Sequence, residues 1–259
     1  MTLIDPVRRF GEDDRGVSET VGFVLVFALI TTTIAITFTV GLGGLNDAQV
    51  AERDNNVERA FDVLHDNLND ISRDGVPSRA TEIRLGGGTL TLNQTSTVRL
   101  NRSDWQAPIT ETGSIAFRGA GDTRIVYENG AVFRMQGDQG VMLREPDLLL
   151  GDTVVYSLYG LNGGRQSVSG DRTVLVVGEL DPRDRGVAND NRTATANVTL
   201  EIDSPQASVW ERYYDGLDPT NESVSVTTDG EADLTVTFVA DEFDRFLVHR
   251  TAPGIDFSG

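Results

Sequence analysis

The feature that most restricts what this chain can fold into is a run of 27 residues without a charged side chain. It extends from Thr20 to Asn46 and reads TVGFVLVFALITTTIAITFTVGLGGLN. A helix needs about 20 residues to cross the ~30 Å hydrocarbon core of a bilayer, so this run is long enough. Its threonine hydroxyls can bond back to the helix backbone, which weakens the segment less than charges would. We therefore predict a membrane-spanning helix over 20–46.

The charge balance of the whole chain is strongly acidic. The 259 residues include 22 basic side chains, all of them arginine, and 40 acidic ones, which gives a net charge of −18. Such a surface argues against nucleic-acid binding, which requires a basic face. An acidic, lysine-free surface stays hydrated where molar salt screens charge repulsion to within ~3 Å. This composition predicts a hypersaline source; a G+C-rich genome would explain the arginines but not the acids.

Residues that carry chemistry are few. There is no cysteine, which excludes disulfides, thiolate metal sites and cysteine nucleophiles. The only two histidines, His65 and His249, are far apart in the sequence, and we expect His65 at a solvated or edge position without chemistry. Nucleophile-elbow, P-loop, zinc-protease and dinucleotide-binding motifs are missing. We predict no catalytic, cofactor-binding or metal site, and no enzyme activity.

The segment before the apolar run, residues 1–16, is short, polar and charged. A secretory signal peptide has an apolar stretch of about 7–15 residues followed by a small-residue cut site. The stretch here is too long, although Gly41, Gly43 and Gly44 keep that alternative open. The remaining alternatives are an uncleaved anchor and a segment that is processed on its charged side.

The residues at this junction suggest a family. Arg15-Gly16-Val17-Ser18-Glu19-Thr20-Val21-Gly22-Phe23 leads directly into the apolar run. It resembles the class III leader of haloarchaeal type IV pilins and archaellins, in a divergent branch, since Ser-Glu stands where the commonest haloarchaeal pattern has Ser-Pro. The resemblance implies that a prepilin peptidase cuts between Gly16 and Val17 and that the helix is retained. It covers about residues 12–75.

Beyond the apolar run the helix is predicted to continue to 75 as an amphipathic segment, 47–74. Its apolar residues recur at near-heptad spacing, interrupted by Asp54, and Asp74-Gly75-Val76-Pro77 supplies a stop. Two interpretations of this stripe are compatible: the half from Val57 onward packs on the following domain, and helices of several subunits bundle together. We call the six residues of the stripe the seam: Val50, Val57, Phe61, Leu64, Leu68 and Ile71.

After Pro77 the periodicity changes from helical to alternating. Short segments rich in Val, Thr and aromatics are separated by turn signals such as Asn129-Gly130, and Gly86-Gly87-Gly88 is expected to form a hairpin turn. One helix is predicted after Ser204-Pro205, with core aromatics. The predicted strands are Thr81–Leu85, Thr89–Leu92, Thr97–Leu100, Ser114–Arg118, Arg124–Glu128, Ala131–Met135, Val141–Arg144, Thr153–Tyr159, Arg172–Glu179, Thr195–Ile202, Ser223–Thr227 and Leu234–Val239.

The predicted fold class is therefore α+β. A leader (1–16) and a long amino-terminal helix (17–75) precede an antiparallel, β-sandwich-like domain (76–250) and a tail (251–259). Five Asn-x-Ser/Thr sequons, all after the apolar run, are candidate glycosylation sites and agree with an extracellular β domain. Arg8, Arg9 and Arg15 support a cytoplasmic amino terminus. The sequons are at Asn93, Asn101, Asn191, Asn197 and Asn221.

These features predict a structural role at the cell surface. Our first hypothesis is a pilin-like protein, processed by a prepilin peptidase, that is a subunit or a minor component of a type IV pilus-like filament. Its expected partners are the membrane, the peptidase, and copies of itself or other pilin-like subunits that bind through the helix. The second hypothesis is a membrane-anchored binding or sensing ectodomain that does not polymerise. A secreted hydrolase is a distant third.

Overall fold

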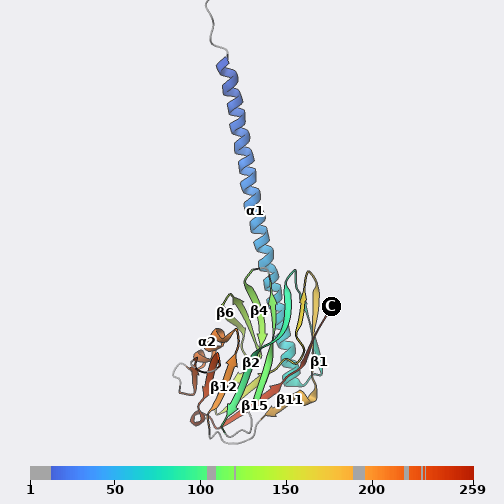
Figure 1. Ribbon diagram of the computed structural model, residues 1–259, viewed down its shortest axis with the longest axis vertical. Helices are drawn as coiled ribbons and strands as arrows, with labels where there is room; N and C mark the ends of the chain where they lie inside the picture. The colour runs from blue at the N-terminus through green and yellow to red at the C-terminus, as the bar shows by residue number, and fades with distance from the viewer. Residues whose placement is uncertain are drawn as a thin grey trace, which may run out of the picture. The chain divides into compact units, whose positions relative to one another are not determined.

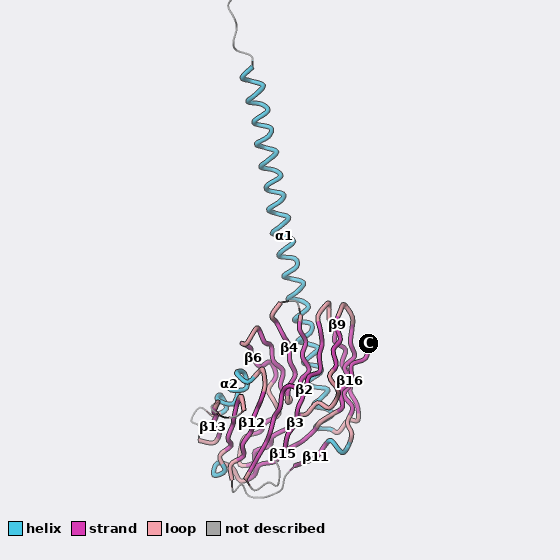
Figure 2. Tube along the Cα trace, in the orientation of Figure 1, coloured by secondary structure: helices cyan, strands magenta, loops and turns pink. Residues whose placement is uncertain are grey.

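The computed structural model describes residues 13–103, 109–119, 121–188, 196–218, 222–228, 230 and 232–259. The chain divides into two compact units, Met1–Ala51 and Glu52–Gly259. The first unit contains the amino-terminal part of one long helix. The second contains the rest of that helix and a β domain (Figures 1 and 2). This arrangement confirms the predicted α+β class: a long apolar helix followed by a curled, mostly antiparallel β domain.

Helix α1 comprises Asp13–Asn69, 57 residues. It stays helical through Gly41, Gly43 and Gly44, where the sequence would allow a bend most easily. In the first unit, every side chain from Glu19 to Gln49 is exposed. The helix is long and apolar enough to cross a membrane, and none of its most apolar window is buried.

The carboxyl-terminal end of the helix is where the sequence predicts it. A π-helical turn, Asp70–Asp74, follows α1, and Gly75 adopts the left-handed conformation with φ of 69°. The amide of Gly75 donates to the carbonyl of Asp70, which satisfies an otherwise unpaired group at the helix end. The Asp74-Gly75 pair therefore acts as the stop that we expected.

The described residues of the second unit form sixteen strands in three sheets. The first sheet has the order β1-β10-β16, with β1 Ser78–Arg84, β10 Thr173–Glu179 and β16 Gly254–Ser258. The second has the order β11-β15-β8-β7, with β11 Arg185–Ala188, β15 Arg245–Thr251, β8 Thr153–Tyr159 and β7 Leu148–Leu149. The third has the order β13-β14-β12-β2-β3-β4-β5-β6, with β9 paired to β2. Its strands are β13 Val224–Thr227, β14 Leu234–Phe238, β12 Val198–Asp203, β2 Thr89–Arg102, β3 Ile109–Arg118, β4 Thr123–Glu128, β5 Ala131–Gln136, β6 Gln139–Arg144 and β9 Gln166–Ser169.

The expected hairpin turn at Gly86-Gly87-Gly88 is wrong. Strand β1 pairs with β10 and strand β2 pairs with β9, both antiparallel. The amide of Gly87 donates to the carbonyl of Gly170, so pairing continues between the two ladders. The chain thus runs on in one direction and passes from one sheet to the next. Gly86 and Gly87 have φ of 51° and 88°, which explains why glycine marks this bend.

The prediction of a tail at 251–259 is also wrong, because these residues contain strand β16. This strand pairs antiparallel with β10, from Leu175↔Ser258 to Glu179↔Gly254. Strand β15 just before it was not predicted, since its Arg and His residues hide the alternation that buries Phe246 and Val248. It pairs parallel to β8, so the domain is not purely antiparallel. The two strands predicted at 89–92 and 97–100 are one strand with a register shift between Asn93 and Thr97.

Two hydrophobic cores hold the β domain together. One lies between the distal part of α1 and strands that include β1, β2, β3, β4 and β10. The other includes helix α2, Ala207–Leu217, which packs against β6, β13 and β14. Trp210 and Tyr214 of α2 are fully buried and stack at 5.8 Å, so these aromatics belong to the core, as expected.

Candidate functional site

The first half of α1 is the most unusual surface of the chain. Its large apolar side chains are exposed all around the helix, from Val21 at 52% to Phe23 at 71%. Within the run, the hydroxyls of Thr31, Thr33 and Thr39 donate to backbone carbonyls four residues earlier, at 2.7–2.9 Å. The backbone and these hydroxyls therefore need no water, and the surface is suited to lipid or to other apolar helices.

The seam divides between the two halves of the helix. Val50, in the first unit, is half-exposed, whereas all five later members are at most 2% exposed. These five pack in the core with residues of β1, β2, β3, β4 and β10. The expected packing of the half from Val57 onward is what the structure shows. Each such side chain contributes roughly 1.5–3 kcal/mol when it is fully buried.

The interruption of the seam has a local explanation. Asp54 occupies a seam position and is only 4% exposed. The preceding residue, Arg53, places Nη2 at 3.3 Å from its Oδ1 and also donates to the carbonyl of Gly86 at 3.3 Å. A Cβ at Gly119 would lie 3.0 Å from atoms of both side chains. The negative charge of Asp54 is therefore balanced by the positive charge of Arg53, at the place where the loops that contain Gly86 and Gly119 approach the helix.

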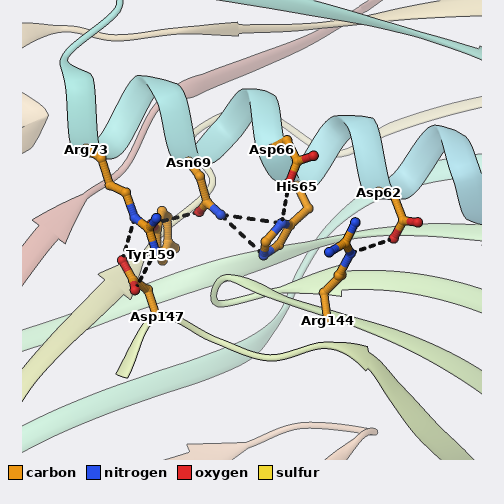
Figure 3. Close-up of polar contacts among 8 residues, drawn as sticks. All are labelled: Asp62, His65, Asp66, Asn69, Arg73, Arg144, Asp147 and Tyr159. Atoms are coloured by element: carbon orange, nitrogen blue, oxygen red, sulfur yellow. Dashed lines mark hydrogen bonds and ion pairs between the residues drawn. The ribbon is translucent and has the colours of Figure 1, made fainter. Parts of the chain in front are cut away.

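Ion pairs and hydrogen bonds flank the buried part of the seam on both sides. On one side, Arg144 of β6 contacts Asp62 at 2.9 Å (Figure 3). On the same side, Arg134 of β5 contacts Glu58 at 2.8 Å. The hydrogen bond to Asp62 raises the pKa of Arg144. On the other side, Arg79 of β1 contacts Asp70 at 3.1 Å. The charges that the sequence places off the seam thus meet partners of opposite sign.

The end of the helix is fixed by contacts from three further segments. Arg73 forms a two-point ion pair with Asp147, at 2.6 and 2.8 Å, and Tyr159 of β8 donates to Asn69 at 2.9 Å (Figure 3). Arg185 of β11 donates to the carbonyls of residues 72 and 73 at 2.9 and 2.8 Å. The two Arg185 bonds satisfy carbonyls that a helix end leaves unpaired, and the side-chain contacts tie the same turn to the β domain.

We expected His65 at a solvated or edge position, and this prediction is wrong. The residue is only 9% exposed. Its ring packs edge-on to Tyr127, with centroids 6.4 Å apart. It also contacts Asp66 and Asn69 (Figure 3). The position beside Leu64 carries the ring into the core because the buried face of the helix is wider than the seam. Burial raises the pKa of Tyr127 well above its usual value.

A buried acid that no sequence motif marks lies at the end of β4. Glu128 is 1% exposed and accepts hydrogen bonds from Ser96, Ser204 and the Trp210 indole, at 2.5, 2.7 and 2.8 Å. Burial raises its pKa, and the three hydrogen bonds oppose that shift. With its lone pairs used in this way, Glu128 joins α2 to β2 and β4 and has a structural role.

The remaining predicted residues are distributed as follows. Gly16 and Val17 lie in the helical backbone of α1, and their side chains are not among those described. Asn101 and Asn197 are exposed, and Asn197 accepts from the amide of Ala240 at 3.0 Å. Asn93 is half-buried and donates to Thr91. Asn191 and Asn221 lie outside the described residues.

Comparison with known proteins places the chain in a family. Residues 15–252 match a family described as a family of unknown function, DUF7289. The chain belongs to this family. The DUF7289 match includes both the apolar helix and nearly all of the β domain, so the two parts form one family unit.

A curated relative is similar to a smaller part of the chain. An uncharacterised protein of the archaeon Archaeoglobus fulgidus is 31% identical over 80 residues, which are 31% of this chain. The chain spans about a quarter, 26%, of the length of that curated relative. No solved structure matches the chain.

Proposed function

We propose that this chain is a pilin-like cell-surface protein, cleaved by a prepilin peptidase between Gly16 and Val17, that serves as a subunit or minor component of a type IV pilus-like filament. One observation carries the proposal: a single helix is apolar and exposed over 20–46 and is then packed into a β domain from Val57 onward. Its first half is left for lipid or other helices, while its second half holds the domain.

This division suits a subunit that changes its surroundings. Before assembly, the exposed half would sit in the membrane, where its uncharged surface is stable. In a filament, the same surface would pack against the helices of other subunits, while the β domain would face outward. The family match begins at residue 15 and therefore includes the proposed cleavage motif along with the helix.

Leader processing tests the proposal most directly. The amino terminus of the protein is determined by mass spectrometry, on membranes and on material sheared from the cell surface. We expect mature protein that begins at Val17, with part of it in the sheared fraction. An intact leader in both fractions would overturn the proposal and leave a membrane-anchored ectodomain that does not polymerise. A start after Gly44 would instead identify an ordinary secreted protein.

A pair of glycine variants provides the control. Gly16→Val places a branched side chain before the proposed cut and should abolish processing. Gly22→Val makes the same change six residues later, where an added Cβ meets nothing within 4 Å. The Gly22 variant should be processed like the wild type. Equal processing of both variants would contradict a cut that depends on Gly16.

A further inference from the structure

A cavity on the β domain combines hydroxyl groups with two arginines. Its volume is about 380 Å³, within the roughly 300–1,000 Å³ of small-molecule sites. It lies over β2, β3 and β4 and is bordered by Pro205 and Gln206, just before α2. It involves no residue of the leader or the seam, so its role is separate from the proposed function.

Two deeply buried side chains present unused hydrogen-bonding groups to this cavity. Gln206 and Ser114 both line it and are 4% and 5% exposed. Ser204 donates its one hydroxyl proton to Glu128, so its 3.1 Å contact with the side-chain amide of Gln206 occupies one end of that amide and leaves the other end to the cavity. Within the described ranges, neither the other end of the Gln206 amide nor Oγ of Ser114 has a hydrogen-bond partner, and neither is among the polar atoms sealed from solvent. Because both groups can be reached from the cavity, they are available to bond a polar ligand there.

The rest of the lining has two chemical characters. Thr89, Thr91 and Thr95 alternate along β2 on the cavity side, as the two-residue period of a strand requires. Ala116 and Val126, from the neighbouring strands, add apolar surface. A row of hydroxyls next to a small apolar patch matches the mixed hydroxyl and C–H surface of a sugar ring.

Two arginines add positive charge to the cavity. Arg118 makes no ion pair or hydrogen bond with the described residues, and Arg124 donates only to the carbonyl of Gly137, at 2.7 Å. Asp122 and Asp138 line an adjoining hollow of about 190 Å³ together with both arginines, but no ion pair joins them in the described part of the chain. In a chain of net charge −18, unpaired guanidinium groups in a cavity indicate an anion, and their planar donors fit a carboxylate.

We propose that this cavity binds a carboxylate-bearing sugar. Arg118 and Arg124 would hold the carboxylate, and Ser114 and Gln206 would bond the hydroxyls. Such a sugar has two sources: an acidic polysaccharide from outside, or a sugar attached to Asn93, which lines the same cavity and is a sequon.

The test uses full-length protein in detergent, made in a bacterium without N-glycosylation so that Asn93 is bare. Trigalacturonate is titrated calorimetrically at fixed salt, with maltotriose as the neutral probe. We expect saturable binding of trigalacturonate alone. Arg118→Gln should weaken it about tenfold, and Ser114→Ala by a few-fold. The matched control is Arg84→Gln, which removes the same charge from an exposed site on β1 and should bind like the wild type.

The outcomes separate clearly once melting curves show that each variant is folded. Equal binding of both probes, no binding up to about 10 mM, or equal losses in the Arg118 and Arg84 variants would each overturn the proposal. Mass spectrometry of protein from the native host then distinguishes the sources. A sugar on Asn93 that blocks trigalacturonate, with binding restored by Asn93→Gln, identifies the chain's own glycan. A bare Asn93 with normal binding identifies an external polysaccharide.

Discussion

The two halves of α1 are built from similar apolar residues but differ in how those residues are arranged. Over 20–46 they surround the helix without any charge, and every side chain is exposed. From Val57 they form one stripe, and the charges beside it meet arginines of the β domain. The contrast teaches that apolar content alone does not decide what a helix packs against. The placement of charge around the stripe decides it.

The largest expected difference between the halves is the cost of removing a phenylalanine. Phe61 is fully buried in the seam, and Phe61→Ala should lower the free energy of unfolding of the β domain by about 3–5 kcal/mol. Phe27→Ala, at a side chain 60% exposed in the first half, should leave it unchanged. Denaturant titration followed by tryptophan fluorescence, to which buried Trp210 contributes, measures both. Equal losses would mean that the exposed half also stabilises the domain.

The second difference concerns an added charge. Ile30→Arg puts a cation in the middle of the uncharged run, at a cost of about 2.5–3.5 kcal/mol in a membrane-spanning helix. We expect a much smaller share of this variant to float with membranes in a density gradient. Val63→Arg adds the same charge to the distal half, at a side chain 51% exposed, and should float like the wild type. If the Ile30→Arg variant floats with membranes as well as the wild type does, the first half of the helix does not span the membrane.

The third prediction concerns Glu128, a buried acid of the β domain whose hydrogen-bond partners are all uncharged. Burial raises the pKa of this carboxyl in the folded state above its value in the unfolded chain, which is near 4.5. The contribution of this group to stability is therefore complete below pH 4.5 and is lost as the pH rises through the folded-state pKa. Glu128→Gln can keep the bond from the Trp210 indole but does not titrate. The stability of the wild type relative to this variant should therefore fall from pH 4.5 upward, by at most about 1.4 kcal/mol per pH unit. Unfolding titrations across that range would expose a pH-independent difference, which contradicts the shift.

The same contrast explains what the sequence could predict. The uncharged run, the five buried seam positions and the stop at Gly75 follow from periodicity and charge, which are local properties. The bend at Gly86–Gly88 and strand β16 depend on pairing with β9 and β10, about 80 residues away in each case, which no local pattern encodes. Glu128 and the cavity arginines were missed for a related reason. The partners of Glu128 come from β2, from the segment before α2 and from α2 itself, and the cavity is lined by residues of several strands. In an acidic chain, one more carboxylate or arginine carries no signal.

The smallest expected effect comes from the ion pairs that flank the seam. It tests whether these pairs or the buried seam hold the distal half of the helix in place. Asp62 and Arg144 are 2.9 Å apart, but their side chains are 39% and 44% exposed. A double-mutant cycle with Asp62→Asn and Arg144→Gln should give a coupling of about 0.2–1 kcal/mol, reduced further in molar salt. The pair Arg99–Glu201, which joins two strands and does not touch the helix, is the matched control and should give a similar value. A coupling above about 2 kcal/mol for the helix pair alone would show that charge holds the helix. The expected result leaves that role to the seam, and the flanking pairs then set only which way the helix faces.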